Sequence, residues 1–354
     1  MGVADRTRGH RTNNIDFLRL LFAGFVLVSH AFELADGNRH REPLTRIFGT
    51  VSLGEVGVCG FFVLSGVLIT QSWQRRPRVA RFLVKRAGRI YPGFLMAAVV
   101  SLMLVAPLST PEGFAVLWAL PPFSLLWLLV LRLPATPGTF PGQPYSYVNG
   151  SLWTLPLEFG CYMLTLGVGV SGILARRAII LAFWLGLLLF LVALREFNLA
   201  GPVAAAAVRL LVMFLAGILC QLYQVARYCG AHRAIAAATC LAVCLGQAGL
   251  AEIALATSGA YLLVCASYAR PLPTLFHRLP DLSYGTYLYG WPIEQLMIRY
   301  CSASPSIVLI VSVPAALACG WASWTLIERP TLRLLDRCST RTSFADGRDN
   351  SLLQ

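Results

Sequence analysis

Two ionisable residues, Arg19 and His30, lie eleven positions apart in the apolar segment DFLRLLFAGFVLVSHAF (16–32). In a helix, this spacing places both side chains within about 20° of one face and about 16 Å apart along the axis. Ionisable residues in a membrane span are costly to desolvate, so they usually serve a function. An imidazole in such a place is a candidate general base, and a guanidinium a candidate anion ligand. The alternative is a helix pair that packs His30 against a polar neighbour.

The basic segment RRPRVARFLVKRAGRIYP, which begins at Arg75, supplies two more candidates. Arg86 and Arg89 are three positions apart, so on a helix they point to the same side and could grip a polyphosphate through bidentate contacts. The alternative is an anchor that touches lipid phosphates and only sets the orientation of the chain.

Glu158 and Glu294 are the carboxylates that lie deepest in apolar segments. Counting residues from the expected ends of their spans puts both about 10 Å below the outer surface, in the half of the membrane that also holds His30. A carboxylate beside an imidazole fixes its tautomer and stabilises the imidazolium. We therefore expect the three side chains to converge. Glu33, one turn after His30, is a competing partner, and each of the two deep carboxylates is also consistent with a protonated structural group.

The composition is typical of a membrane protein. Of 354 residues, 57% are hydrophobic and 13% charged, and the mean hydropathy is +0.66. Each crossing requires about 20 apolar residues in a helix. We therefore predict an all-α, polytopic membrane bundle of about ten spans, at 15–34, 55–73, 91–109, 151–173, 178–194, 203–223, 234–250, 253–269, 282–302 and 305–326.

The apolar run 112–131 is an eleventh candidate. Pro121 and Pro122 lie at its centre and a turn-rich stretch follows it, so we expect its backbone to be re-entrant or interfacial. Ten spans with both termini in the cytoplasm also place most of the basic residues on the cytoplasmic side. This bias and anionic lipid account for the net charge of +13, without a nucleic-acid partner.

The chain divides into an N-terminal tail (1–14), a transmembrane domain (15–332) and a polar C-terminal tail (333–354) that we expect to be disordered. The first apolar run has no small-residue cleavage site, so we expect it to remain as the first span. The ten cysteines lie mostly in spans without metal-ligand spacing. We interpret them as small buried apolar residues, and we expect no metal and no bound cofactor.

Six strings in register carry a resemblance to a known family. They are the segment from Asn14 to His30, GVCGFFVLSGVLIT (57–70), KRAGRIYP (85–92), SLWTLPLEF (151–159), LSYGTYLYGWP (282–292) and IERP (327–330). Together they resemble the membrane-bound acyltransferase family 3. The resemblance implies about ten spans and transfer of acyl groups, commonly acetyl, from coenzyme A to hydroxyls of sugars in surface or secreted glycans.

The same resemblance assigns roles. It maps the Arg-x10-His pattern on Arg19 and His30, the RxxR pattern on Arg86 and Arg89, and the carboxylate after the tryptophan motif on Glu158. Two positions depart from the family pattern. Cys59 stands where many members have an aspartate, and Gly290 replaces the histidine of a His-Trp-Pro string.

We therefore expect an acetyl-CoA-dependent O-acyltransferase in the bacterial inner membrane, with lipid, acyl-CoA and a glycan as its partners. His30 would be the general base oriented by Glu158, and Arg19, Arg86 and Arg89 would bind the donor. The supporting residues are Asp16, Ser65, Trp153, Tyr284, Tyr287 and Glu294. The rival classes are a transporter or flippase, for which ten spans with buried charges are also suitable, and a silent scaffold of a glycan-assembly complex.

Overall fold

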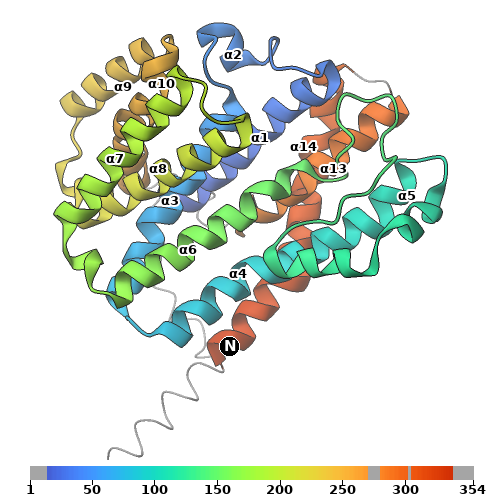
Figure 1. The fold of residues 1–354 in the computed structure, drawn as a ribbon, viewed down its shortest axis with the longest axis horizontal. Coiled ribbons are helices and arrows are strands. Elements are labelled where there is room, and N and C mark those ends of the chain that lie inside the picture. Colours follow the sequence, from blue (N-terminus) through green and yellow to red (C-terminus); the bar gives the residue numbers. More distant parts are fainter. Residues whose placement is uncertain (1–13, 270–279, 302–303, 338–354) are drawn as a thin grey trace, which may run out of the picture.

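The computed structural model describes residues 14–269, 280–301 and 304–337, and within these ranges it is a bundle of helices without strands (Figure 1). The longer helices are α1 (Ile15–Asp36), α3 (Leu53–Arg75), α4 (Val79–Val100), α6 (Leu155–Val170), α7 (Arg177–Glu196), α8 (Pro202–Leu222), α9 (Ala231–Leu245), α13 (Ser283–Cys301) and α14 (Pro305–Ser323). The shorter α-helices are α2 (Pro43–Phe48), α5 (Ala106–Leu108), α10 (Ala248–Ala254) and α11 (Ala260–Tyr268). The predicted all-helical fold is confirmed.

Three pairs of helices are joined by π-helical turns into longer continuous helices. The turns are η2 (Ser101–Val105) after α4, η8 (Leu255–Gly259) after α10 and η9 (Trp324–Glu328) after α14. The continuous helix that contains α14 reaches Arg337. Residues 333–337, which we expected in the tail, therefore belong to this helix, while the rest of the tail and residues 1–13 lie outside the described residues.

Seven helices of the described chain are long and apolar enough to cross a membrane, and they correspond to seven of the ten expected spans. Of the other three, α6 and α9 are short, with 16 and 15 residues, and α13 carries many polar residues. The run 112–131 forms two 3₁₀ helices, η3 (Gly113–Ala119) and η4 (Pro122–Val130), which are bent by 85°. The two prolines thus break this run, as expected.

Helix α1 lies in the middle of the bundle, between α3 on one side and α13 on the other, and α8 packs on α3 (Figure 1). Helices α3 and α8 approach closely at Gly66 and Gly217, since a Cβ at either position would lie 2.1 Å from a backbone oxygen of the other helix. At its start, α1 is tied to the end of α11 because the Asn14 amide donates to the carbonyl of Ala266. These contacts fix where Arg19 and His30 project.

The connection from η4 to α6 alternates between exposed and buried residues, and its end enters the bundle. Leu131, Phe140 and Val148 are buried along it. At its end, Asn149 donates to the carbonyl of Leu288 in the middle of α13 at 2.9 Å. The 3₁₀ turn η5 (Gly150–Thr154) and helix α6 therefore begin inside the bundle, which decides the position of Glu158.

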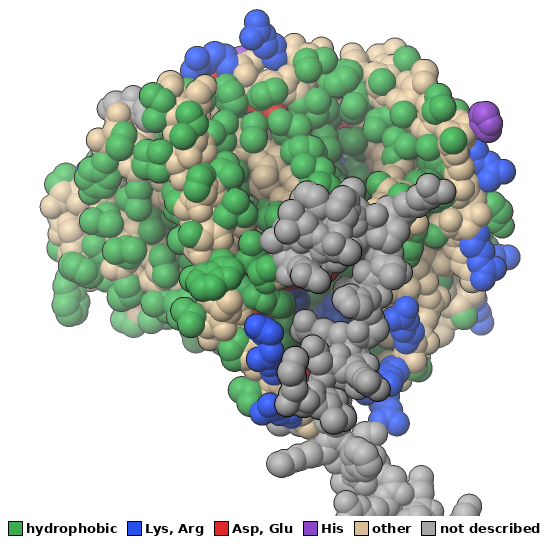
Figure 2. All heavy atoms as spheres, turned by 180° about the vertical axis from the view of Figure 1, so that it is seen from behind, with side chains coloured by type: hydrophobic (Ala, Val, Ile, Leu, Met, Phe, Trp, Pro, Cys, Tyr) green, Lys and Arg blue, Asp and Glu red, His purple; other side chains and the backbone are tan. Residues whose placement is uncertain are grey.

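The surface has the distribution of charge that a membrane protein needs. Hydrophobic side chains cover most of the face shown in Figure 2, and the Lys and Arg side chains gather near its margins. Large apolar side chains remain exposed on several helices, among them Leu189, Phe190 and Ile310. This pattern fits a chain whose middle faces hydrocarbon.

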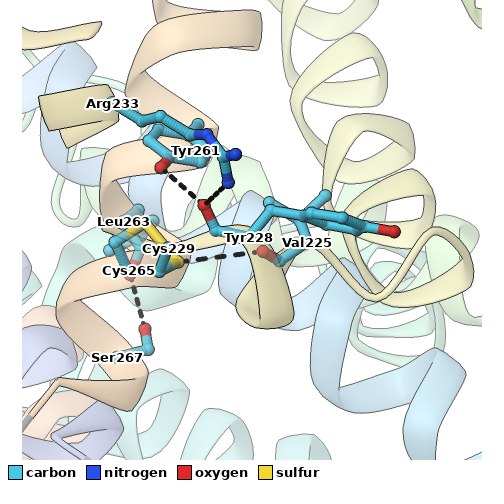
Figure 3. Close-up of a disulfide and its surroundings, with 8 residues drawn as sticks. All are labelled: Val225, Tyr228, Cys229, Arg233, Tyr261, Leu263, Cys265 and Ser267. Carbon is cyan, nitrogen blue, oxygen red and sulfur yellow. Dashed lines mark hydrogen bonds between the residues drawn. A yellow bond between two sulfur atoms is a disulfide. The ribbon is translucent and has the colours of Figure 1, made fainter. Parts of the chain in front are cut away.

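One cysteine pair differs from the sequence interpretation. Cys229 and Cys265 form a disulfide, which links the segment after η7 (Val225–Tyr228) to α11 (Figure 3). Arg233 and Tyr261 both donate to the carbonyl of Tyr228 beside it. The interpretation of the cysteines as small buried residues holds for Cys59 and Cys161, whereas Cys240 and Cys301 are exposed.

Candidate active site

Arg19 and His30 both lie on α1, as predicted, and neither has an ion-pair partner in the described chain. Arg19 is four residues from the start of the helix and its buried Nε has no hydrogen-bond partner. His30 is six residues from the end. Its ring is half-buried, and its buried Nδ1 also has no partner. Polar atoms buried without a partner are rare, so both are candidates to bind a ligand.

The imidazole of His30 lies against the indole of Trp291 on α13. Their ring centroids are 4.8 Å apart at an interplanar angle of 81°, which is an edge-to-face contact. The indole Nε1 donates to the carbonyl of Tyr147 at 3.1 Å. Gly150 makes room for this ring, because a Cβ there would lie 2.6 Å from it. Trp291 thus holds the imidazole from one side while leaving its nitrogens free.

Gly290, the position at which the family pattern has a histidine, faces α1. A Cβ at this position would lie 2.6 Å from the end of the Leu27 side chain. Because Gly290 has no side chain, α13 can approach α1 beside His30. With glycine at this position, His30 is the histidine that this part of the site offers.

Glu158 does not contact His30, so the predicted pairing of these residues is wrong. Its Oε1 accepts hydrogen bonds from Ser65 at 3.2 Å and from the hydroxyl of Tyr162. The counting argument fails because η5 starts inside the bundle, so Glu158 lies near Arg19 and not at the level of His30. Ser65, expected as a supporting residue, has its hydroxyl engaged by this carboxylate.

A pocket brings Arg19 and Glu158 together. It is narrow, with a cavity volume of about 30 Å³. The other lining residues are Val58, Phe61, Phe62, Thr154, Leu155, Ser283, Tyr284 and Tyr287. Tyr287 lies one turn before Trp291 on α13, but neither Trp291 nor His30 lines the pocket. Its walls combine a cation, a carboxylate, hydroxyl groups and apolar rings.

Arg86 and Arg89 lie on α4, as neighbours of this pocket, but in different environments. Arg86 packs over the rings of Phe82 and Tyr162, each at 5.9 Å, and its buried Nε has no hydrogen-bond partner. Arg89 instead forms ion pairs with Asp281 at 2.6 Å and Glu328 at 3.4 Å. Arg89 is thus held by two carboxylates while Arg86 has none, and the expectation that both guanidinium groups grip one polyphosphate stays a prediction.

The Arg89 ion pair is strong at Asp281, which lies in the segment before α13. Burial opposes the ionisation of this carboxyl, but Arg89 and Arg19 outweigh the effect and lower its pKa to about 2. Tyr284 lies on the other side of Arg89, with its ring centroid 5.5 Å from the guanidinium carbon. Sequence spacing could not find this cluster, although Asp281 and Glu328 each lie beside or within a recognised string.

Three other predicted residues, Glu294, Asp16 and Trp153, belong neither to the lining of the pocket nor to the ion pairs of Arg89. Glu294 is fully buried and accepts a hydrogen bond from Ser312 on α14 at 3.4 Å, and no contact joins it to His30 or Glu158. The predicted convergence of the three side chains is therefore wrong. Asp16 and Trp153 are exposed. Among the described residues, no group of three or more His, Cys, Asp or Glu side chains could hold a metal ion.

Comparison with known proteins supplies the family. A family model described as an acyltransferase domain, Acyl_transf_3, matches residues 12–325. The chain belongs to this acyltransferase family. It is 28% identical to an O-acetyl transferase of Shigella phage Sf6 over 95% of this chain and 99% of that protein. It is also 29% identical to nodulation protein 10 of Rhizobium leguminosarum bv. viciae, over 93% and 95%. No solved structure matches.

These findings confirm the resemblance drawn from the six strings. They make the chain an acyltransferase of the membrane-bound type, and the apolar helices make it a multi-pass membrane protein. The geometry leaves His30 without a hydrogen bond at Nδ1 near the end of α1, and it brings Arg19 and Glu158 together near the start of that helix.

Proposed function

We propose that this acyltransferase moves an acyl group, acetyl in our account, from acyl-CoA to a hydroxyl of a sugar in a cell-surface or secreted glycan. The observation that carries the proposal is the pairing of two unpartnered groups on one helix, the anion-binding Arg19 and the imidazole of His30, about 16 Å apart along the axis. The name of the phage relative, O-acetyl transferase, supports acetyl as the group and oxygen as the acceptor atom.

The donor binds at the end of the bundle where α1 begins, which we place at the cytoplasmic face of a bacterial inner membrane. Arg19 and Arg86 have free N–H groups for its phosphates, since guanidinium groups bind phosphate through charge-assisted hydrogen bonds. The pantetheine arm extends past Glu158, Tyr284 and Tyr287 toward His30, which requires the narrow pocket that these residues line to widen when the donor binds. Arg89 positions this region through its two carboxylates and does not bind the donor.

The chemistry takes place at His30. A sugar hydroxyl attacks the thioester carbonyl while the imidazole removes its proton, the carbon–sulfur bond breaks, and the leaving thiolate takes the proton back from the imidazolium. The products are the acyl ester and free coenzyme A. A variant with an acyl-histidine intermediate would give ping-pong kinetics.

The test uses purified full-length protein with labelled acetyl-CoA and candidate glycans. The proposal predicts release of free coenzyme A that depends on the acceptor, together with label on the glycan. Movement of a glycan across vesicles without thiol release would instead support a transporter, and the absence of both activities a scaffold.

A further inference from the structure

A second cluster of polar and aromatic side chains surrounds His30 on the side away from Arg19. Glu33 lies three residues after His30, on the adjoining turn of α1. Its Oε1 accepts a hydrogen bond from the hydroxyl of Tyr145 at 3.1 Å. Its Oε2 accepts from Nε of Arg39 at 3.0 Å. Two segments distant in the chain, the end of α1 with the loop after it and the stretch that holds Tyr145, thus meet one helical turn from the imidazole.

Trp291 connects this cluster directly to His30. The ring of Tyr145 lies 5.8 Å from the indole of Trp291 at 76°, and the same indole lies 4.8 Å from the imidazole. Gln295, one turn further along α13, donates to the carbonyl of Tyr145 at 2.9 Å. Tyr145 is therefore held in place at its hydroxyl, its ring and its backbone.

The cluster is balanced in charge, in contrast to the donor end. Arg39 is paired with Glu33 and lies 3.7 Å from Glu55, which in turn pairs with Arg209 at 2.8 Å. Arg19 and Arg86 at the other end have no carboxylate partner within ion-pair distance. A neutral ligand rich in hydroxyl groups is therefore a better fit here than a phosphate, because the paired charges offer hydrogen bonds without attracting an anion.

The exposure of the side chains also suits a ligand. Tyr145 is half-buried, and 39% of the Arg39 side chain and 11% of the Glu33 side chain are accessible. A carboxylate has about four lone-pair sites and a guanidinium five N–H groups, so both retain capacity after their mutual contact. A half-exposed aromatic ring next to such groups offers an apolar face for the C–H face of a sugar.

We propose that Tyr145, Glu33 and Arg39 form the subsite for the acceptor sugar, with the ring of the sugar on Tyr145 and its hydroxyl groups on the Glu33–Arg39 pair, so that one hydroxyl reaches His30. The role as an acceptor subsite rests on the proposed acyl transfer. The sugar binding itself is independent of it and is tested separately.

The experiment measures binding and kinetics with wild type and variants. Binding is observed by saturation-transfer NMR with the methyl glycosides of glucose, galactose, mannose, rhamnose and N-acetylglucosamine, added to purified protein. For the glycoside that binds best, Tyr145→Ala should abolish the signal and raise the acceptor KM about tenfold. Tyr145→Phe, which keeps the ring and loses the bond to Glu33, should have a smaller effect. The KM for acetyl-CoA should stay the same in both variants.

Tyr147→Ala is the matched control. Tyr147 belongs to the same segment, its side chain is 63% exposed and its ring forms no hydrogen bond or ring contact in the described structure. The Tyr147→Ala protein should bind the glycoside as the wild type does. Equal losses in both alanine variants, a change in donor KM alone, or no glycoside bound by the wild type would overturn the inference. Tyr145-dependent binding without any thiol release would instead reject the acyl transfer and leave the sugar site standing.

Discussion

The indole of Trp291 packs edge to face against the imidazole of His30, with 4.8 Å between the ring centroids. It is the only ring contact of His30 in the described structure. Because the buried Nδ1 of His30 has no hydrogen-bond partner there, the orientation of the imidazole depends on this packing. Trp291 itself is fixed by its bond to the carbonyl of Tyr147.

Replacing Trp291 should therefore affect the chemical step and not the binding of the donor. We expect Trp291→Ala to lower kcat by up to about 10²-fold, because a displaced general base loses its alignment with the hydroxyl. The dissociation constant of acetyl-CoA should not change. Trp321→Ala, at an exposed tryptophan of α14, is the control and should retain wild-type kcat. A weaker donor affinity with unchanged kcat in Trp291→Ala would contradict this role.

Arg86 and Arg89 should respond differently to substitution, although they are one helical turn apart. Arg86→Ala should weaken acetyl-CoA binding by about 10- to 100-fold, the effect of a lost charge-assisted hydrogen bond, with little loss of stability. Arg89→Ala should destabilise the fold by about 3–5 kcal/mol, because it leaves the carboxylates of Asp281 and Glu328 without their cation. Calorimetric titration measures the affinity for acetyl-CoA, and thermal unfolding in detergent measures stability, so together they distinguish the two roles. A stable Arg89→Ala protein with weak donor binding would show that Arg89 binds the donor after all.

Glu158→Gln should change the kinetic parameters for the donor, acetyl-CoA. Glu158 lines the pocket with Arg19 and bonds Ser65 and Tyr162. We therefore expect an altered KM for acetyl-CoA and an unchanged pH dependence of kcat. If Glu158 oriented His30, the substitution would shift the pH profile of kcat instead, which a series of rate measurements would reveal.

The low pKa of Asp281 predicts how the stability of the fold depends on pH. A carboxyl whose folded-state pKa is lowered stabilises the fold above its unfolded value, and this contribution is lost as the pH falls through the folded value, here about 2. The ion pair with Arg89 should thus persist throughout the range of about pH 5 to 8, so the thermal stability of Asp281→Asn relative to wild type should be constant over it. A difference that disappears near pH 5 would show that the carboxyl is protonated there.

The positions of Arg19 and His30 could be predicted from the sequence, since both lie on one uninterrupted helix and the period of the helix fixes their relation. The partners of Arg89 could not, because Asp281 and Glu328 are 192 and 239 residues away in the chain. Counting residues along a span also failed for Glu158. Its helix begins inside the bundle, and only the bond between Asn149 and Leu288 reveals this.

The contrast between local sequence signals and long-range contacts also applies to the two ends of the proposed site. The proposed donor end was predicted from the density of arginines, which is a local signal. The cluster of Glu33, Arg39 and Tyr145 is built from α1, the loop after it and the return segment before η5, and its residue types are common in outer loops. Glu33 could be placed beside His30 from the sequence, since it lies one turn further along α1, whereas Tyr145 is linked to the imidazole through Trp291.

The central claim is that His30 is the base for acyl transfer, and one measurement tests it most directly. Purified wild type and His30→Ala are compared for acceptor-dependent release of coenzyme A from acetyl-CoA, with donor binding measured on the same samples. The account predicts a loss of turnover of about 10²–10⁴-fold at unchanged donor affinity. Acylation of the acceptor by His30→Ala at the wild-type rate would contradict it.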